Sequence, residues 1–90
     1  MSDVEKILEE RQKTHGSFKT HSEIAQGLKD IMKSHDGGLD EVQKEGLEMI
    51  LHKIARLLNG KADYKDHWDD IAGYATLVSK HIEEKENLPK

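Results

Sequence analysis

The sequence has no cysteine, a single proline, few aromatic residues and only short apolar stretches, such as Met49-Ile50-Leu51. Without cysteine the chain forms neither disulfides nor thiolate metal sites, which agrees with a reducing compartment. Stretches this short predict neither a membrane span nor an apolar signal segment. The net charge of −4 also gives no general attraction to DNA or RNA, which requires a basic face. We therefore expect a cytoplasmic protein with no membrane and no nucleic-acid partner.

The length of 90 residues predicts one helical domain spanning residues 1–90. Hydrophobic residues make up 34% of the chain and charged residues 36%, so the core is thin for a monomer of this size. We therefore expect part of the apolar surface to be buried against another copy of the chain, in a closed symmetric oligomer. The charged end, residues 83–90, is expected to fray.

Four segments carry apolar residues at helical spacing, and none alternates as a β-strand does. Gly16 is a natural end for the first helix, and either Ser17 or Thr20 caps the second. Gln43 three residues after Asp40 forms a capping box at the start of the third. The expected helices run from a capping box at Ser2 to about Lys13, from Ser17 or Thr20 to the loop at 34–38, from Asp40 to Asn59, and from about Asp66 to about Lys85.

This pattern predicts an all-α fold of about four helices, in which the third and fourth form a long antiparallel hairpin. The apolar stripe of the fourth helix includes Trp68, which we expect in the core rather than stacked on a base. A second face of the same helix carries Gly73, Tyr74 and Leu77. Glycine inside a helix costs about 1 kcal/mol relative to alanine, so Gly73 indicates close approach by a neighbouring helix, a second subunit or a ligand.

Two carboxylate pairs are the most informative feature of the hairpin. Glu45 and Glu48 lie one turn apart on the third helix, and Asp66 and Asp70 lie one turn apart on the fourth. Carboxylates that converge from two helices are suited to Mg²⁺, which prefers oxygen ligands and shares them with substrate phosphates. The alternatives are a solvated acidic face on the third helix and stabilisation of the fourth helix start, with Asp66 as its N-cap.

The spacing limits how these pairs meet within one chain. Seventeen residues separate Glu48 from Asp66, and Glu48 lies about 16 Å from Asn59 along the third helix. Asp66 and Asp70 instead lie near the connecting loop, so the two pairs face each other only partly. A complete metal site then requires a loop that carries the chain back or a second subunit.

Basic residues and histidines add candidates for anion binding. Lys53 and Arg56, one turn apart, either hold phosphate oxygens or pair with acids of the fourth helix. The stretch from Arg11 to Lys19 leads into a helix N-terminus, which is either an anion site or simply a pair of helix caps. Six histidines include no His-x-x-x-His pair, so zinc is not expected, and His67 beside the aspartates is the one of interest.

The segment Glu45-x-x-Glu48, followed after 17 residues by Asp66-x-x-Asp69, resembles the ExxE…ExxD signature of all-α, MazG-like nucleoside triphosphate pyrophosphohydrolases. The departures are Asp66, which stands where a glutamate is usual, and Asp70, which is the alternative to Asp69 as the working residue; the sequence leaves open which of these three aspartates binds metal. The resemblance implies a helical oligomer that uses Mg²⁺ to cleave (d)NTPs between the α and β phosphates. It implies metal ligation by Glu45, Glu48, Asp66 and Asp70, and catalytic roles for Glu48, Lys53 and Arg56.

Three further segments are similar to a small phage- and prophage-borne family of unknown function, and they cover most of the chain. They are Glu10-Arg11-x-x-Thr14-His15-Gly16-x-Phe18, Lys53-Ile54-Ala55-Arg56 and Asp66-His67-Trp68-x-Asp70-Ile71-Ala72-Gly73-Tyr74-Ala75. The leading hypothesis is a phage-encoded, MazG-like (d)NTP-binding protein or pyrophosphohydrolase, in which Tyr74 is the candidate ring for base stacking. The alternative is a non-catalytic helical protein that sequesters a nucleotide signal or docks on a host protein through Tyr74 and Leu77.

Overall fold

The computed structural model describes residues 3–88, apart from the side chain of Thr14, and within this range the chain is all-α, as predicted. The capping box expected at Ser2 lies outside the described residues. The helices of the described range are α1 (Asp3–His15), α2 (Phe18–Ser34), α3 (Glu41–Asn59) and α4 (Lys65–Glu86). None of them combines the length and the apolar character that a membrane crossing requires.

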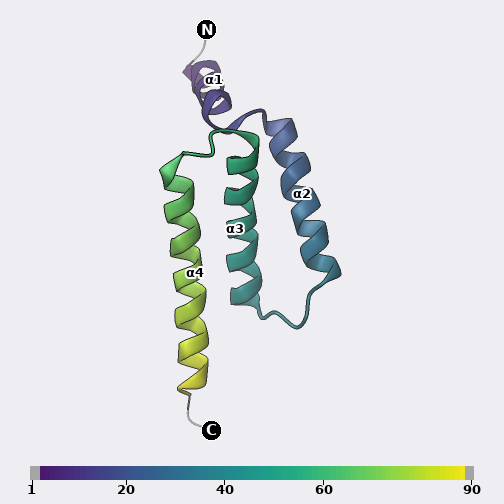
Figure 1. The fold of residues 1–90 in the computed structure, drawn as a ribbon, viewed down its shortest axis with the longest axis vertical. Coiled ribbons are helices and arrows are strands. Elements are labelled where there is room, and N and C mark those ends of the chain that lie inside the picture. Colours follow the sequence, from purple (N-terminus) through teal and green to yellow (C-terminus); the bar gives the residue numbers. More distant parts are fainter. Residues whose placement is uncertain (1–2, 89–90) are drawn as a thin grey trace.

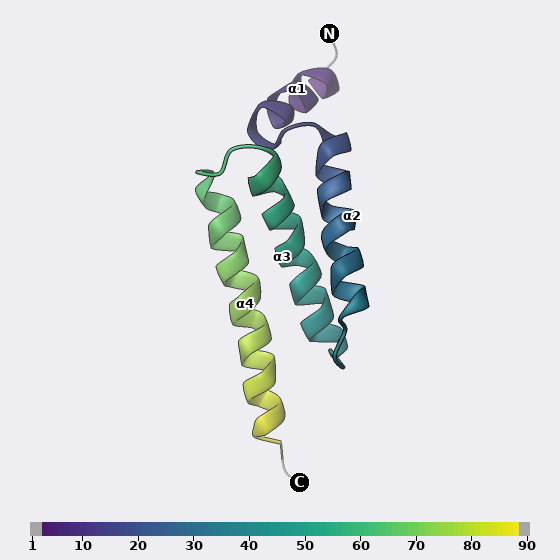
Figure 2. The ribbon, with the colours of Figure 1, turned by 45° about the vertical axis from the view of Figure 1, so that its right-hand side comes forward.

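Helix α3 lies between α2 and α4 and runs antiparallel to both, so the three form a row (Figure 1, Figure 2). Helix α1 lies at one end of the row, beside the loop that joins α3 to α4 (Figure 1). The hairpin expected from the two C-terminal helices is therefore present. Within the described residues α2 and α4 do not touch each other, so the row does not close into a bundle.

An open row buries little apolar surface. The buried hydrophobic residues of the described range are Ala25, Ala55 and Leu57, all on α2 or α3. The accessible surface is 6898 Å², about 1,500 Å² more than a compact monomer of this mass exposes. The expectation of Trp68 in the core was wrong, because α4 is covered on one side only. Trp68 is 56% exposed, and its Nε1–H donates to the Ala62 carbonyl oxygen at 2.8 Å.

Of the three helix starts whose proposed cap lies within the described residues, those of α2 and α3 carry a predicted capping residue and that of α4 does not. The Asp40 side chain accepts from the Gln43 amide at 2.8 Å, and Gln43 accepts from the Asp40 amide at 3.0 Å, which confirms the capping box. Ser17 rather than Thr20 caps α2. Helix α4 begins after Tyr64 with no side-chain cap, so Asp66 lies in the first turn and is not the N-cap.

Two glycines of the hairpin behave differently from each other. A Cβ at Gly46 would overlap the side chain of Val78, so α3 and α4 approach each other closely there. A Cβ at Gly73 meets no atom within 4 Å. Within the described residues no helix of the same chain makes the close approach predicted at Gly73, and an approach by a second subunit or a ligand stays a prediction.

Candidate functional site

The four predicted metal ligands lie at different heights along the hairpin. Lys53 on α3 stands opposite Asp70 on α4, with Nζ and Oδ2 3.0 Å apart. Glu48 lies about 8 Å from that level along α3, and Glu45 about 12 Å. Asp66 lies about 6 Å beyond Asp70 in the opposite direction. Within one chain, Glu45 and Asp66 therefore lie about 18 Å apart along the hairpin axis.

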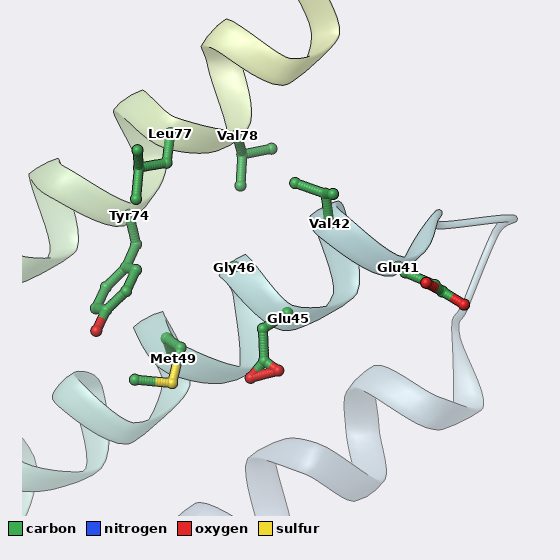
Figure 3. Close-up of a pocket in the computed structure, with 8 residues that line it drawn as sticks. All are labelled: Glu41, Val42, Glu45, Gly46, Met49, Tyr74, Leu77 and Val78. Atoms are coloured by element: carbon green, nitrogen blue, oxygen red, sulfur yellow. The ribbon is translucent and has the colours of Figure 1, made fainter.

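The environment of these carboxylates also differs. Glu45 is exposed, and its carboxylate points away from α4 (Figure 3). Asp66 is exposed in the first turn of α4. Asp70 is half-exposed and its negative charge is matched by Lys53. Within residues 3–88, no three histidine, aspartate or glutamate side chains are grouped so that they could hold a metal ion.

A cluster of cationic and imidazole side chains forms where the α1–α2 turn meets the α3–α4 loop. We call this region the Arg–His end, and it consists of His15, His21, His52, Lys53, Arg56 and His67. The His67 Nε2 and His15 Nδ1 atoms lie 3.0 Å apart although 52 residues separate them in sequence. The rings of His21 and His52 are 5.6 Å apart. Helices that are distant in the sequence therefore converge here.

Asn59 holds the α1–α2 turn against the end of α3. Its Nδ2 donates to the His15 carbonyl oxygen at 2.8 Å and to the Ser17 carbonyl oxygen at 2.9 Å. Gly16 lies between these two carbonyls with φ +76°, a left-handed conformation that favours glycine. The Gly16 amide also closes α1 by donating to Gln12 at 2.8 Å. The turn, and with it His15, is thus fixed relative to Arg56.

The Arg–His end has a positive electrostatic character. Burial, together with nearby positive charges, lowers the pKa of each of the four histidines below the ordinary value of 6.5. Arg56 contributes to the lowered pKa in all four, and Lys53 in three of them. The imidazoles are therefore neutral near pH 7, and the fixed positive charge is that of Lys53 and Arg56.

The lowered pKa values predict how stability depends on pH. Between the folded-state pKa and 6.5, the unfolded chain binds more protons at these histidines than the folded chain does. The contribution of the neutral histidines to the free energy of unfolding is complete above about pH 6.5 and is lost as the pH falls below it. We expect the urea midpoint to decrease between about pH 7.5 and about pH 5.5, and to decrease less in a His52→Gln variant. A midpoint that is constant or rises over this range would contradict the lowered pKa values of the clustered histidines.

A second feature is an apolar groove between α3 and α4, on the side shown in Figure 3. Tyr74, Leu77 and Val78 of α4 face Gly46 and Met49 of α3 across a volume of about 330 Å³. Leu77 is 62% exposed. Tyr74 therefore lies in an apolar groove along the hairpin, away from the cationic side chains that would hold phosphate.

Sequence reasoning named Lys53, Arg56, His67 and the Arg11–Lys19 stretch that holds His15, but it missed His21, His52 and the convergence of all six residues. It counted six histidines and rejected a helical zinc pair, but a row of helices brings four of them together through tertiary contacts. It also treated Asn59 only as a helix stop, whereas its side chain joins two elements. The available signal was the set of three motif segments, which carry Arg11 and His15, Lys53 and Arg56, and His67; the structure brings these segments to one end.

Comparison with known proteins identifies a family but no characterised relative. A family model described as Domain of unknown function (DUF6378) matches residues 1–82, which is most of the chain. No curated protein and no solved structure matches the chain.

Proposed function

The chain belongs to the DUF6378 family, and we propose that it is a MazG-like nucleotide-binding protein that holds the phosphates of a (d)NTP at the Arg–His end. The observation that carries this proposal is the excess of positive charge there. Lys53 is matched by Asp70, but Arg56 forms no ion pair within residues 3–88. Around it burial first, and then positive charges that include Arg56, lower the pKa of four histidines, so these imidazoles are neutral and Arg56 keeps an unpaired positive charge among them.

A phosphate group is suited to the unpaired positive charge of Arg56. The guanidinium of Arg56 presents a planar fork of N–H donors, which matches two phosphate oxygens at once. Arg56 is half-buried, so its attraction for an anion is screened less by water than that of an exposed arginine. Lys53 lies one turn away, and its ammonium supports a second phosphate when Asp70 moves or is neutralised by a cation.

The Mg²⁺ ion that the MazG-like resemblance implies does not fit one chain as it stands. The carboxylates are spread along the hairpin, and within residues 3–88 no suitable group of three acidic or histidine side chains exists. We therefore derive no hydrolytic step from a single chain. A pyrophosphohydrolase activity requires a second copy whose Glu45 and Glu48 approach the Asp66–Asp70 end of the first.

A second copy is supported by the open row of helices. Grooves of about 330 and 440 Å³ lie between α3 and α4, and the second is lined in part by Leu47, Ile50 and Ile82. The surface excess of about 1,500 Å² exceeds the ~800 Å² that each partner buries in a standard stable interface. We propose an antiparallel homodimer along α3 and α4, which would also explain the open space beside Gly73.

The alternative function is a non-catalytic protein that docks on a host protein, as phage-encoded proteins of this size can do. The observation that favours it is the apolar groove of Figure 3, in which Tyr74 and Leu77 are available for contact. Variants distinguish the two functions, because a docking protein is sensitive at Tyr74 and Leu77 and tolerant at Arg56.

Calorimetric titration with a non-hydrolysable dNTP, with and without Mg²⁺, tests the proposal. We expect the wild type to bind the analogue and Mg²⁺ to strengthen binding. Asp70→Asn should abolish the effect of Mg²⁺ but bind the metal-free analogue at least as well as the wild type, because Lys53 is released. Asp69→Asn is the matched comparison, since within residues 3–88 Asp69 pairs with Lys65 alone, on the exposed side of α4, and an unchanged Mg²⁺ effect in this variant would assign the metal to Asp70 rather than Asp69.

Two results would contradict parts of this account. Absence of binding with and without Mg²⁺ would overturn the nucleotide proposal and favour the docking alternative. Binding that Mg²⁺ strengthens equally in the wild type and in Asp70→Asn would overturn the role of Asp70 at the metal.

A further inference from the structure

A cavity of about 320 Å³ opens beside the Arg–His end, between α1, the start of α2 and α3. Arg11 and His15 line it from α1, His21 from α2 and Arg56 from α3. Its size falls within the range of roughly 300–1,000 Å³ that is usual for small-molecule sites. We call it the Arg11–Arg56 cavity. It is separate from both grooves of the α3–α4 hairpin.

The charged side chains that line this cavity are all basic. Arg11 and Arg56 contribute to its wall, and no aspartate or glutamate does. Within residues 3–88 neither arginine forms an ion pair. The α2 N-terminus also begins at this wall, and its first-turn amides carry partial positive charge. An anion that enters the cavity therefore meets two guanidinium groups and a helix N-terminus.

His21 brings a nearly buried ring with an unpartnered nitrogen to the cavity wall. Its side chain lines the cavity and is 8% exposed, yet its Nδ1 has no hydrogen-bond partner within the described residues. A buried polar atom without a partner is destabilising and rare in folded proteins. The Nδ1 atom has almost no accessible surface, so a phosphate oxygen reaches it only after the imidazole turns, and an Nδ1–H that then donates to the phosphate would remove this deficit.

The mouth of the cavity carries an unusual apolar surface. Phe18 is 82% exposed, and its ring stacks on His21 at 6.1 Å with an interplanar angle of 25°. Leu8, also on the wall, is 57% exposed. The Phe18 ring is therefore largely free of contacts, lies nearly parallel to the His21 imidazole, and offers a flat apolar surface beside a cationic site. Stacked aromatic rings of this kind bind nucleobases.

We propose that the Arg11–Arg56 cavity is the nucleotide site itself, with the phosphates between Arg11 and Arg56 and the base stacked on Phe18. The inference rests on the proposed function and specifies where and how the nucleotide binds. It replaces Tyr74 by Phe18 as the ring that contacts the base, and it adds Arg11 and His21 to the phosphate-binding residues.

The test compares two ligands on three variants by calorimetry. The ligands are a non-hydrolysable dATP analogue and inorganic tripolyphosphate, which lacks the base. We expect Arg11→Gln to weaken both ligands about 10- to 100-fold, because one charge-assisted contact is lost. Phe18→Ala should weaken the dATP analogue about tenfold or more and leave tripolyphosphate unchanged within about twofold. Lys19→Gln is the control, because it removes a neighbouring positive charge that is not on the cavity wall, and its affinities should match the wild type.

Each outcome decides a separate point. If the wild type binds the dATP analogue and Arg11→Gln and Phe18→Ala bind it equally well, the cavity is not the site, while the proposed function stands. If Phe18→Ala weakens tripolyphosphate as much as the nucleotide, the stacking role is overturned. If the wild type binds neither ligand, both proposals fall. Arg11 and Phe18 are exposed, so circular dichroism of each variant is expected to match the wild type.

Discussion

Replacement of Gly16 by alanine is expected to lower the free energy of unfolding by about 2–5 kcal/mol. Two effects add. The left-handed φ of +76° disfavours any side chain with a Cβ. A Cβ at this position would also overlap the carbonyl oxygen and the side chain of Asn59. The turn would then move away from α3, and the two hydrogen bonds from Asn59 to His15 and Ser17 would break.

Gly27→Ala provides the matched control for this prediction. Gly27 lies within α2, and a Cβ there meets no atom within 4 Å. Alanine is therefore expected to stabilise the protein by about 0.5–1 kcal/mol through helix propensity. Urea denaturation of the two variants measures both effects. Similar changes in the two variants, or no change in Gly16→Ala, would contradict the docking of the α1–α2 turn on Asn59.

The second large effect is expected from Arg56→Gln, which should weaken binding of a dNTP analogue about 10- to 100-fold. Arg56 belongs to both the Arg–His end and the wall of the Arg11–Arg56 cavity, and unlike His15 and His21, which also belong to both, it carries a permanent positive charge. The substitution keeps the length and polarity of the side chain but removes its charge and its fork of donors.

Arg56→Gln has a second expected consequence that does not depend on any ligand. Because Arg56 contributes to the lowered pKa of all four clustered histidines, its loss should raise these pKa values toward 6.5. The decrease in stability between about pH 7.5 and about pH 5.5 should then be smaller than in the wild type. Lys44→Gln, an exposed position on the same helix, is the control for loss of one charge. Equal nucleotide affinity in Arg56→Gln and Lys44→Gln would remove Arg56 from the site.

The helices could be predicted because their signals are local. Periodic apolar residues gave α3 and α4, and the pairing of Asp40 with Gln43 gave the start of α3. The interpretation of Gly16 and Ser17 as a C-terminal glycine and an N-cap was also correct. Each of these features involves residues within four positions of one another, so no knowledge of the tertiary structure is needed.

Predictions that depend on how helices pack were less successful. An amphipathic stripe shows which face of α4 is apolar, but it does not show whether a partner covers that face. Trp68 is exposed because the helices form an open row. The sequence offered two roles for Lys53, and the structure contains the ion pair with Asp70. That choice depends on the register between α3 and α4. In this register Gly46 of α3 packs closely against Val78 of α4.

The candidate site was the hardest part to predict, because it depends on long-range docking. His15 and His67 meet only when the α1–α2 turn packs against the loop after α3. The Asn59 side chain makes that docking specific, and neither its identity nor its spacing signals this role. The carboxylates attracted attention because they are numerous and regularly spaced, whereas the cationic residues that converge are scattered over three segments.

The most direct test of the central claim is a ¹H–¹⁵N NMR titration of the full chain with a non-hydrolysable dATP analogue. The account predicts shift changes concentrated in residues 11–21 and 52–59, together with changes at the imidazole nitrogens of His15 and His21. Tyr74 and Leu77 should change little. Changes centred on Tyr74 and Leu77, or no changes at any residue, would contradict nucleotide binding at the Arg–His end.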